Sequence, residues 1–210
     1  MAAALVVLAS AVPARAQERG PIPVAVFEIR GVTGGLPADP ATREDLGLSE
    51  LPRRAFGGVA GLQFFPVRRL GFAVGVGGEG LWARTGADIV DTAGALTGDR
   101  VVRHLQGLAG IVSLNFGHDG GWSHISGGLG PLTFRDSLSP RPEPSPTQNV
   151  LSPYAWTLNA GGGARWFLSR HAGVGFDIRV YFTRAAAETP ESAGRQAQRL
   201  VLMSMGVTIK

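Results

Sequence analysis

Hydrophobic and polar residues alternate along much of this chain with a period of two, the pattern typical of β-strands. The clearest stretch is 173–182, where the apolar positions are Val174, Phe176, Ile178, Val180 and Phe182. The positions between them are Gly173, Gly175, Asp177, Arg179 and Tyr181. Because a strand projects successive side chains to opposite sides, this segment has one apolar face and one face of glycine and polar side chains.

Seven further segments show or approach the same alternation. Three are regular, at 70–82, 156–167 and 200–209, and four are less so, at 24–32, 56–65, 102–116 and 122–134. Most are long enough for a tilted strand to cross a bilayer, which takes roughly 9–11 residues. Eight is also the smallest common strand number of membrane barrels. The sequence therefore predicts an all-β fold, an eight-stranded antiparallel up-and-down transmembrane β-barrel.

The composition of the two faces indicates which one points outward. In a soluble sandwich or a lipocalin, the apolar face would point inward and the polar face would meet water. Here the polar face is rich in glycine and alanine, which suit the crowded interior of an eight-stranded barrel. Bulky Phe, Val, Leu and Trp side chains suit a lipid-facing exterior. We therefore expect a barrel that is apolar outside and polar inside.

Long and short connections alternate between these segments. The long ones are 33–55, 84–100, 135–153 and 184–198, and the short ones are 66–69, 117–121 and 168–172. Outer-membrane barrels have long loops outside the cell and short turns in the periplasm, so both termini are predicted to be periplasmic. Aromatic residues near segment ends are expected to form girdles at the headgroup level. These are Trp82, Trp122, Tyr154, Trp156, Trp166 and Tyr181.

The length of the chain is that of one domain, or at most two. The chain has 210 residues, of which 31 are glycine and none is cysteine, so disulfides, thiolate metal sites and a cysteine nucleophile are excluded. Its formal net charge is +4, but the densest basic clusters are only Arg53-Arg54 and Arg68-Arg69. A nucleic-acid partner is therefore not expected.

The first residues have the features of a targeting segment. The apolar run 2–12 is too short to span a bilayer as a helix, and Ala14 and Ala16 form the small-x-small pattern of a secretory cleavage site. We predict a signal peptide over 1–16 and an outer-membrane barrel domain over 17–210. A buried N-terminal helix is the alternative.

The stretch 159–179 resembles the penultimate hairpin of OmpA/OmpX-type eight-stranded outer-membrane β-barrels. It has a glycine-rich segment that ends in aromatic residues, a short turn, and a segment with Asp177 and Arg179, which the resemblance implies face the lumen. The resemblance implies a location in the outer membrane of a Gram-negative bacterium, contact with its lipid and lipopolysaccharide, and insertion by the barrel-assembly machinery. Such proteins usually end in an aromatic residue, whereas this chain ends in Lys210.

Six charged residues fall on faces predicted to point into the lumen. They are Glu28, Arg30, Glu79, Arg165, Asp177 and Arg179. Charges of both signs in a confined space must pair, because an unpaired buried charge carries a large desolvation penalty. We expect a lumen charge network that fills and rigidifies the barrel. A narrow polar pore is the alternative.

His124 and Ser126 are the strongest candidates for catalysis. Some eight-stranded barrels modify lipid A, and one such group uses a His, a Ser and an acidic residue. His124 and Ser126 share a face, but no acidic residue follows on that segment before Asp136, so a complete triad is not expected. His118 and Asp119 near His124 look like ordinary turn residues instead of metal ligands. We predict no catalytic, cofactor-binding or metal-binding residue.

These observations favour an outer-membrane β-barrel protein with a structural or surface-interaction role, which is not an enzyme and needs no cofactor. An extracellular partner would bind through the long connections, chiefly 33–55 and 135–153. Two alternatives stay open. One is a lipid A-modifying outer-membrane enzyme, and the other is a soluble periplasmic lipocalin-like binding barrel.

Overall fold

The computed structural model describes residues 20–37, 51–90, 96–139, 148–151, 154–185 and 196–210. It contains nine strands: β1 (Ala25–Gly35), β2 (Arg54–Arg69), β3 (Gly71–Val90), β4 (Leu96–His118), β5 (Gly121–Ser139), β6 (Gln148–Leu151), β7 (Ala155–Phe167), β8 (Ala172–Thr183) and β9 (Gln198–Ile209). Within these ranges, no helical segment has the length and apolar character needed to cross a membrane. The predicted signal peptide at 1–16 lies outside the described residues and stays a prediction.

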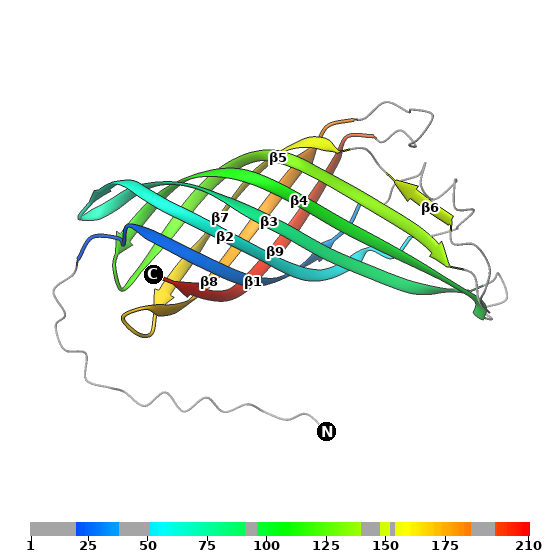
Figure 1. Ribbon diagram of the computed structural model, residues 1–210, viewed down its shortest axis with the longest axis horizontal. Coiled ribbons are helices and arrows are strands. Elements are labelled where there is room, and N and C mark those ends of the chain that lie inside the picture. Colours follow the sequence, from blue (N-terminus) through cyan, green and yellow to red (C-terminus); the bar gives the residue numbers. More distant parts are fainter. Residues whose placement is uncertain (1–19, 38–50, 91–95, 140–147, 152–153, 186–195) are drawn as a thin grey trace, which may run out of the picture.

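Eight of the strands form a closed antiparallel ring (Figure 1). The order is β4-β3-β2-β1-β9-β8-β7-β5, and pairing between β4 and β5 closes it. The short β6 pairs with the far end of β5, where Arg135 faces Leu151. Closure satisfies the backbone hydrogen bonds that an open sheet edge would leave unpaired. The predicted eight-stranded antiparallel barrel is thus confirmed, with β6 as an addition that the alternation did not reveal.

The two ends of the barrel differ. The turns β2–β3, β4–β5 and β7–β8 lie at one end, together with the start of β1 and the C-terminus (Figure 1). The strand ends that the predicted long connections join lie at the other end, where β3, β4 and β5 extend furthest (Figure 1). We call these the turn end and the loop end.

The exterior is apolar, as predicted. Ile178 on β8, Met205 on β9 and Leu108 on β4 are 38%, 69% and 67% exposed, although none is polar. Their counterparts of opposite parity, such as Asp177 and Arg179, are buried. This arrangement is the reverse of a lipocalin, whose exterior is polar.

Interior glycines let neighbouring strands approach each other closely. A Cβ atom at Gly163 on β7 would collide with the backbone carbonyl oxygen of Phe176 on β8, and one at Gly206 on β9 would collide with that of Ile29 on β1. At these positions a side chain would push the strands apart. This explains much of the glycine on the inward face.

Several predicted connections are shorter than expected because the strands continue into them. β3 runs to Val90 and β4 begins at Leu96, so most of 84–100 is a paired hairpin. β5 likewise continues to Ser139. The predicted turn at 66–69 is also wrong, since β2 runs through it with a register shift between Phe64 and Val67. Pro66 lacks the N–H that a regular ladder needs, and the chain reverses at Leu70 and Gly71, where Gly71 has φ +82°.

The interior is polar only in its middle, so the prediction of a barrel that is polar inside holds in part. A large apolar cluster fills the half nearer the loop end: Val32, Leu36, Ala55, Val59, Leu81, Ala83, Leu105, Leu132, Phe134, Tyr181, Leu200 and Leu202. A smaller one lies near the turn end: Ile22, Val26, Phe65, Ala73 and Trp122, with Phe167 packed against it. Two residues expected in the outer girdles, Trp122 and Tyr181, are therefore inside the barrel, 3% and 5% exposed.

Candidate functional site: a charged layer in the closed interior

The six predicted lumen charges all lie buried between the two apolar clusters. Glu28 and Arg30 come from β1, Glu79 from β3, Arg165 from β7, and Asp177 and Arg179 from β8. Their parity on each strand turns them inward, and the strand register brings them to a similar height. They form a network in which three carboxylates oppose three guanidinium groups. We call this network the charged layer.

Arg165 and Glu28 form the tightest contact of the charged layer. Arg165 Nε donates to Glu28 Oε1 at 2.7 Å, and its Nη2 donates to Glu28 Oε2 at 2.8 Å. Such two-point pairing matches the planar guanidinium to the carboxylate. Thr208 also donates to Glu28 Oε1 at 2.8 Å, and Gln63 accepts from Arg165 at 3.3 Å. The pair thus ties β1 to β7 across the lumen.

His124 joins this pair to the rest of the layer. Arg165 Nη1 lies 3.2 Å from His124 Nδ1, and His124 Nε2 lies 3.0 Å from Asp177 Oδ2. A guanidinium can only donate, so Nδ1 is the acceptor and the ring proton is on Nε2, facing the carboxylate. Both ring nitrogens are therefore engaged.

The remaining contacts cluster around Arg179 and Glu79. Arg179 donates to Asp177 at 3.3 Å and to Asn159 at 2.6 Å, and its Nε lies 3.5 Å from Glu79 Oε1. Arg30 donates to Glu79 Oε2 at 3.1 Å. These contacts extend the layer across β1, β3, β7 and β8.

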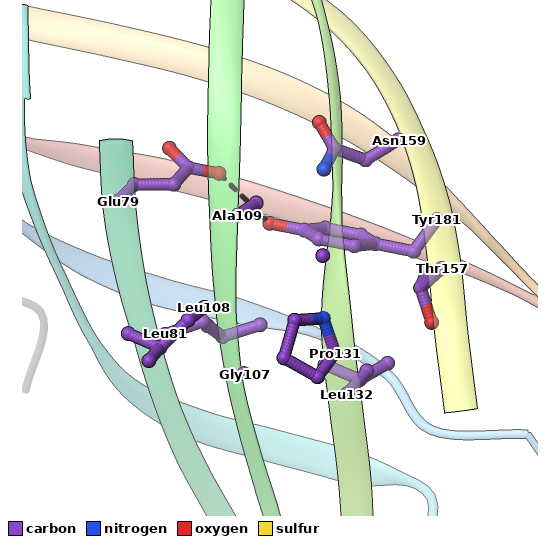
Figure 2. A pocket seen from close by; sticks show the side chains of 11 residues that line it. Glu79, Leu81, Gly107, Leu108, Ala109, Pro131, Leu132, Thr157, Asn159 and Tyr181 are labelled. Carbon is purple, nitrogen blue, oxygen red and sulfur yellow. Dashed lines mark hydrogen bonds between the residues drawn. The ribbon is translucent and has the colours of Figure 1, made fainter. Parts of the chain in front are cut away.

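A small cavity lies where the charged layer meets the larger apolar cluster. Figure 2 shows Tyr181 and Glu79 pointing toward one another above Leu81 and Leu132, and the Tyr181 hydroxyl donates to Glu79 Oε1 at 3.4 Å. The cavity volume is about 10 Å³, which is close to the space of a single water molecule. This part of the lumen is packed with side chains.

The candidate catalytic pair does not form a triad. An acidic residue does lie beside His124, namely Asp177 from β8, which the search along one segment missed. However, Ser126 Oγ accepts a hydrogen bond from Arg179 at 2.9 Å, while the two His124 nitrogens are held by Asp177 and Arg165. No ring nitrogen is left to activate the serine.

The suggested metal ligands are also separated. His118 Nδ1 accepts from the backbone of Gly120 at the β4–β5 turn and is partly exposed, whereas His124 is buried in the charged layer. In the ranges that the structure describes, no group of three or more His, Cys, Asp or Glu residues is arranged to hold a metal ion.

A second buried ion pair closes the loop end, and the sequence analysis missed it. Arg103 on β4 and Asp136 on β5 are 0% and 1% exposed, with Arg103 Nε donating to Asp136 Oδ1 at 3.0 Å. Arg103 Nη1 also donates to the carbonyl oxygens of Pro37 and Pro52, at 3.0 and 3.4 Å. Arg103 thus fastens both ends of the β1–β2 connection to the barrel.

Replacing Arg103 with methionine is expected to release that connection. Each hydrogen bond from a charged donor contributes about 1.5–3 kcal/mol, so cleavage of the folded barrel by trypsin after Arg53 or Arg54 should accelerate about tenfold or more. Limited proteolysis of the refolded protein measures this rate. The control is Arg100→Met, which removes an exposed partner of Asp88. Equal rates in wild-type protein and Arg103→Met would contradict the assigned role.

The barrel is similar in structure, but not in sequence, to known proteins. No known protein-family profile matches the sequence, and no curated protein matches it in sequence. In structure, the chain is similar to Ail, the attachment invasion locus protein of Yersinia pestis, solved with the heparin analogue sucrose octasulfate. The TM-score is 0.51 at 10% identity, over 88% of this chain and 97% of that one.

Neisserial surface protein A (NspA) is similar to the same degree, with a TM-score of 0.51 and 10% identity over 91% of this chain and 99% of that one. The fold is that of an eight-stranded outer-membrane β-barrel. At this identity the likeness concerns the fold alone. The outer-membrane barrel fold nevertheless agrees with the apolar exterior, since bulky apolar side chains cover the outer faces of the strands.

Proposed function

We propose that the protein resides in the outer membrane of a Gram-negative bacterium, with both termini in the periplasm and the loop end outside the cell. The start of β1 and the C-terminus support this orientation, because they lie at the same end as the tight turns (Figure 1). The predicted signal peptide provides the route of export, and the barrel-assembly machinery would insert the barrel.

We further propose a structural or surface-interaction role without catalysis. The observation that carries this proposal is the charged layer, whose carboxylates and guanidinium groups pair with one another between two apolar clusters. Such an interior stabilises the barrel. A reaction or a conducting pore would instead need open space and polar groups that are free of hydrogen-bond partners. A lipid A-modifying enzyme is the less favoured candidate, because Ser126 and His124 bind other partners.

The surface for a partner would then be the loop end. There β3, β4 and β5 project as a three-stranded extension with polar outward residues such as Arg84, Arg100 and Ser137. In the proposed orientation this extension stands away from the membrane, where it can meet an extracellular partner.

Single-cysteine labelling tests this proposal, since the chain has no cysteine of its own. Asp99→Cys near the β3–β4 hairpin tip should react in intact cells with a membrane-impermeant maleimide. Ser169→Cys in the β7–β8 turn should react only after the outer membrane is broken. The reverse pattern would overturn the orientation. A changed lipid A profile after deletion of the protein, restored by wild type but not by His124→Ala, would overturn the non-catalytic role.

A further inference from the structure

Three side chains form a row across the outer face of the three-stranded extension. Arg84 on β3 faces His104 on β4 in the strand register, and His104 faces Arg135 on β5. Residues directly opposite each other in antiparallel strands project to the same side. Arg84 and Arg135 are exposed, and neither has a carboxylate partner among the described residues. We call these residues the basic row.

The basic row lies at the edge of the apolar exterior. On β3 the outward residues from Phe72 to Trp82 carry no charge, and the next outward residue is Arg84. The outward residues of β4 are likewise uncharged from Phe116 to Gln106, after which comes His104. On β5 Arg135 occupies the same position. The basic row thus holds the first ionisable side chains beyond the apolar surface of three adjacent strands. In the proposed orientation this is the height of the lipid phosphates.

The outer wall directly below the basic row is hollow. Trp82, Gln106 and Leu108 line a depression of about 570 Å³, together with Tyr154 at its rim. A second depression of about 550 Å³ borders it and is lined by Phe27, Leu62, Leu129 and Trp156 among others. Both depressions are open to the barrel exterior.

The cause of the hollow is a local lack of side chains. Gly58, Ala60 and Gly80 are outward residues on β2 and β3, and Ala60 faces Gly80 in the register. On the other side, the β4–β5 ladder is interrupted where Leu108 would pair with Pro131, because proline cannot donate a backbone hydrogen bond. Bulky residues such as Trp82 and Leu108 surround this area, so the depression has apolar walls, and the basic row begins at the next outward residues after Trp82 and Gln106.

We propose that the basic row and the hollow together bind one lipid A molecule of the outer leaflet, with its phosphates on Arg84 and Arg135 and an acyl chain in the hollow. Guanidinium groups bind phosphate at two points, and two such groups two strands apart, about 10 Å, suit a headgroup with more than one phosphate. The imidazole of His104 between them can donate a further hydrogen bond. This inference rests on the proposed orientation, which puts the loop end in the outer leaflet.

The test is a titration of the purified, folded barrel in detergent micelles with bis-phosphorylated lipid A, followed by native mass spectrometry. The double variant Arg84→Gln/Arg135→Gln should bind lipid A at least about tenfold more weakly than wild type, because it loses two charge-assisted phosphate contacts. Gly58→Leu should also weaken binding, by filling the hollow. Its new Cβ meets no atom closer than 3.7 Å, so the strand can accept it.

The matched control is Arg184→Gln/Arg199→Gln, which removes two exposed arginines that likewise follow the apolar exterior of β8 and β9 but do not border the hollow. It should bind as wild type does. Equal affinity in the Arg84→Gln/Arg135→Gln variant, or equal binding of dephosphorylated lipid A or of phosphatidylglycerol, would overturn the inference. The labelling of Asp99→Cys reports on orientation separately, so a correctly oriented barrel without selective lipid A binding would refute this inference alone.

Discussion

Replacing Arg165 with methionine should lower the free energy of unfolding of the barrel by about 3–5 kcal/mol, the usual cost of removing one partner of a buried ion pair. The variant would leave Glu28 buried without its two-point partner, and His124 and Gln63 would each lose a donor. Urea unfolding of the protein refolded into lipid vesicles measures the change. Trp122 provides a fluorescence signal, because its ring lies 5.7 Å from the Arg165 guanidinium.

Two controls separate the ion pair from a loss of packing. In the double variant Glu28→Gln/Arg165→Met, no charge is left unpaired at this contact, so its destabilisation should be smaller than the sum of the two single effects. Arg100→Met removes a solvent-exposed partner and should stay within about 0.5 kcal/mol of wild type. An Arg165→Met variant as stable as Arg100→Met would show that the charged layer does not hold the barrel together.

Replacing Ile178 with arginine should destabilise the barrel in vesicles by about 2–4 kcal/mol, the cost of a cation at the bilayer midplane. Ile178 lies in the middle of the outer face of β8 and is 38% exposed on the barrel surface. In a water-soluble protein the same substitution at an exposed position would change stability by about 0.5 kcal/mol at most. Unfolding in urea, with vesicles of one lipid composition, gives the comparison.

The control is a residue on the same face of β8 that lies nearer the edge of the bilayer. Phe182 shares the face of Ile178 but lies at the loop end of β8, so Phe182→Arg should cost only about 0–1 kcal/mol for its charge. Equal costs at the two positions, or no cost at Ile178, would contradict a lipid-facing exterior.

The regular strands could be predicted from sequence because only one of their faces is apolar. Along β8 the alternation separates Phe176 from Asp177 without ambiguity, and the structure turns them to opposite sides as expected. The extension of β3 past Arg84 could not be seen this way. Beyond the apolar exterior, both faces of β3 carry polar or small residues. The alternation of apolar and polar residues therefore disappears, although the backbone pairing with β4 continues.

Membership of the charged layer could be predicted, but its pairing could not. Parity alone directs Glu28 and Arg165 inward, yet the two are 137 residues apart, and only the register of the closed ring brings them together. The same limit hid the contact between His124 and Asp177. Tyr181 is different, because it has the same parity as Asp177 on β8 and therefore points inward although it lies near the strand end.

The central expectation is that the apolar face of the barrel is in lipid while the opposite face is packed inside. Nitroxide labels placed one at a time along β9 from 201 to 209, in the cysteine-free chain reconstituted in vesicles, test it directly. Labels at Val201, Met203, Met205 and Val207 should be accessible to oxygen and protected from a water-soluble nickel complex, whereas labels at Leu202 and Ser204 should be protected from both. Ready access of the nickel complex to Met203 and Met205 would contradict the account.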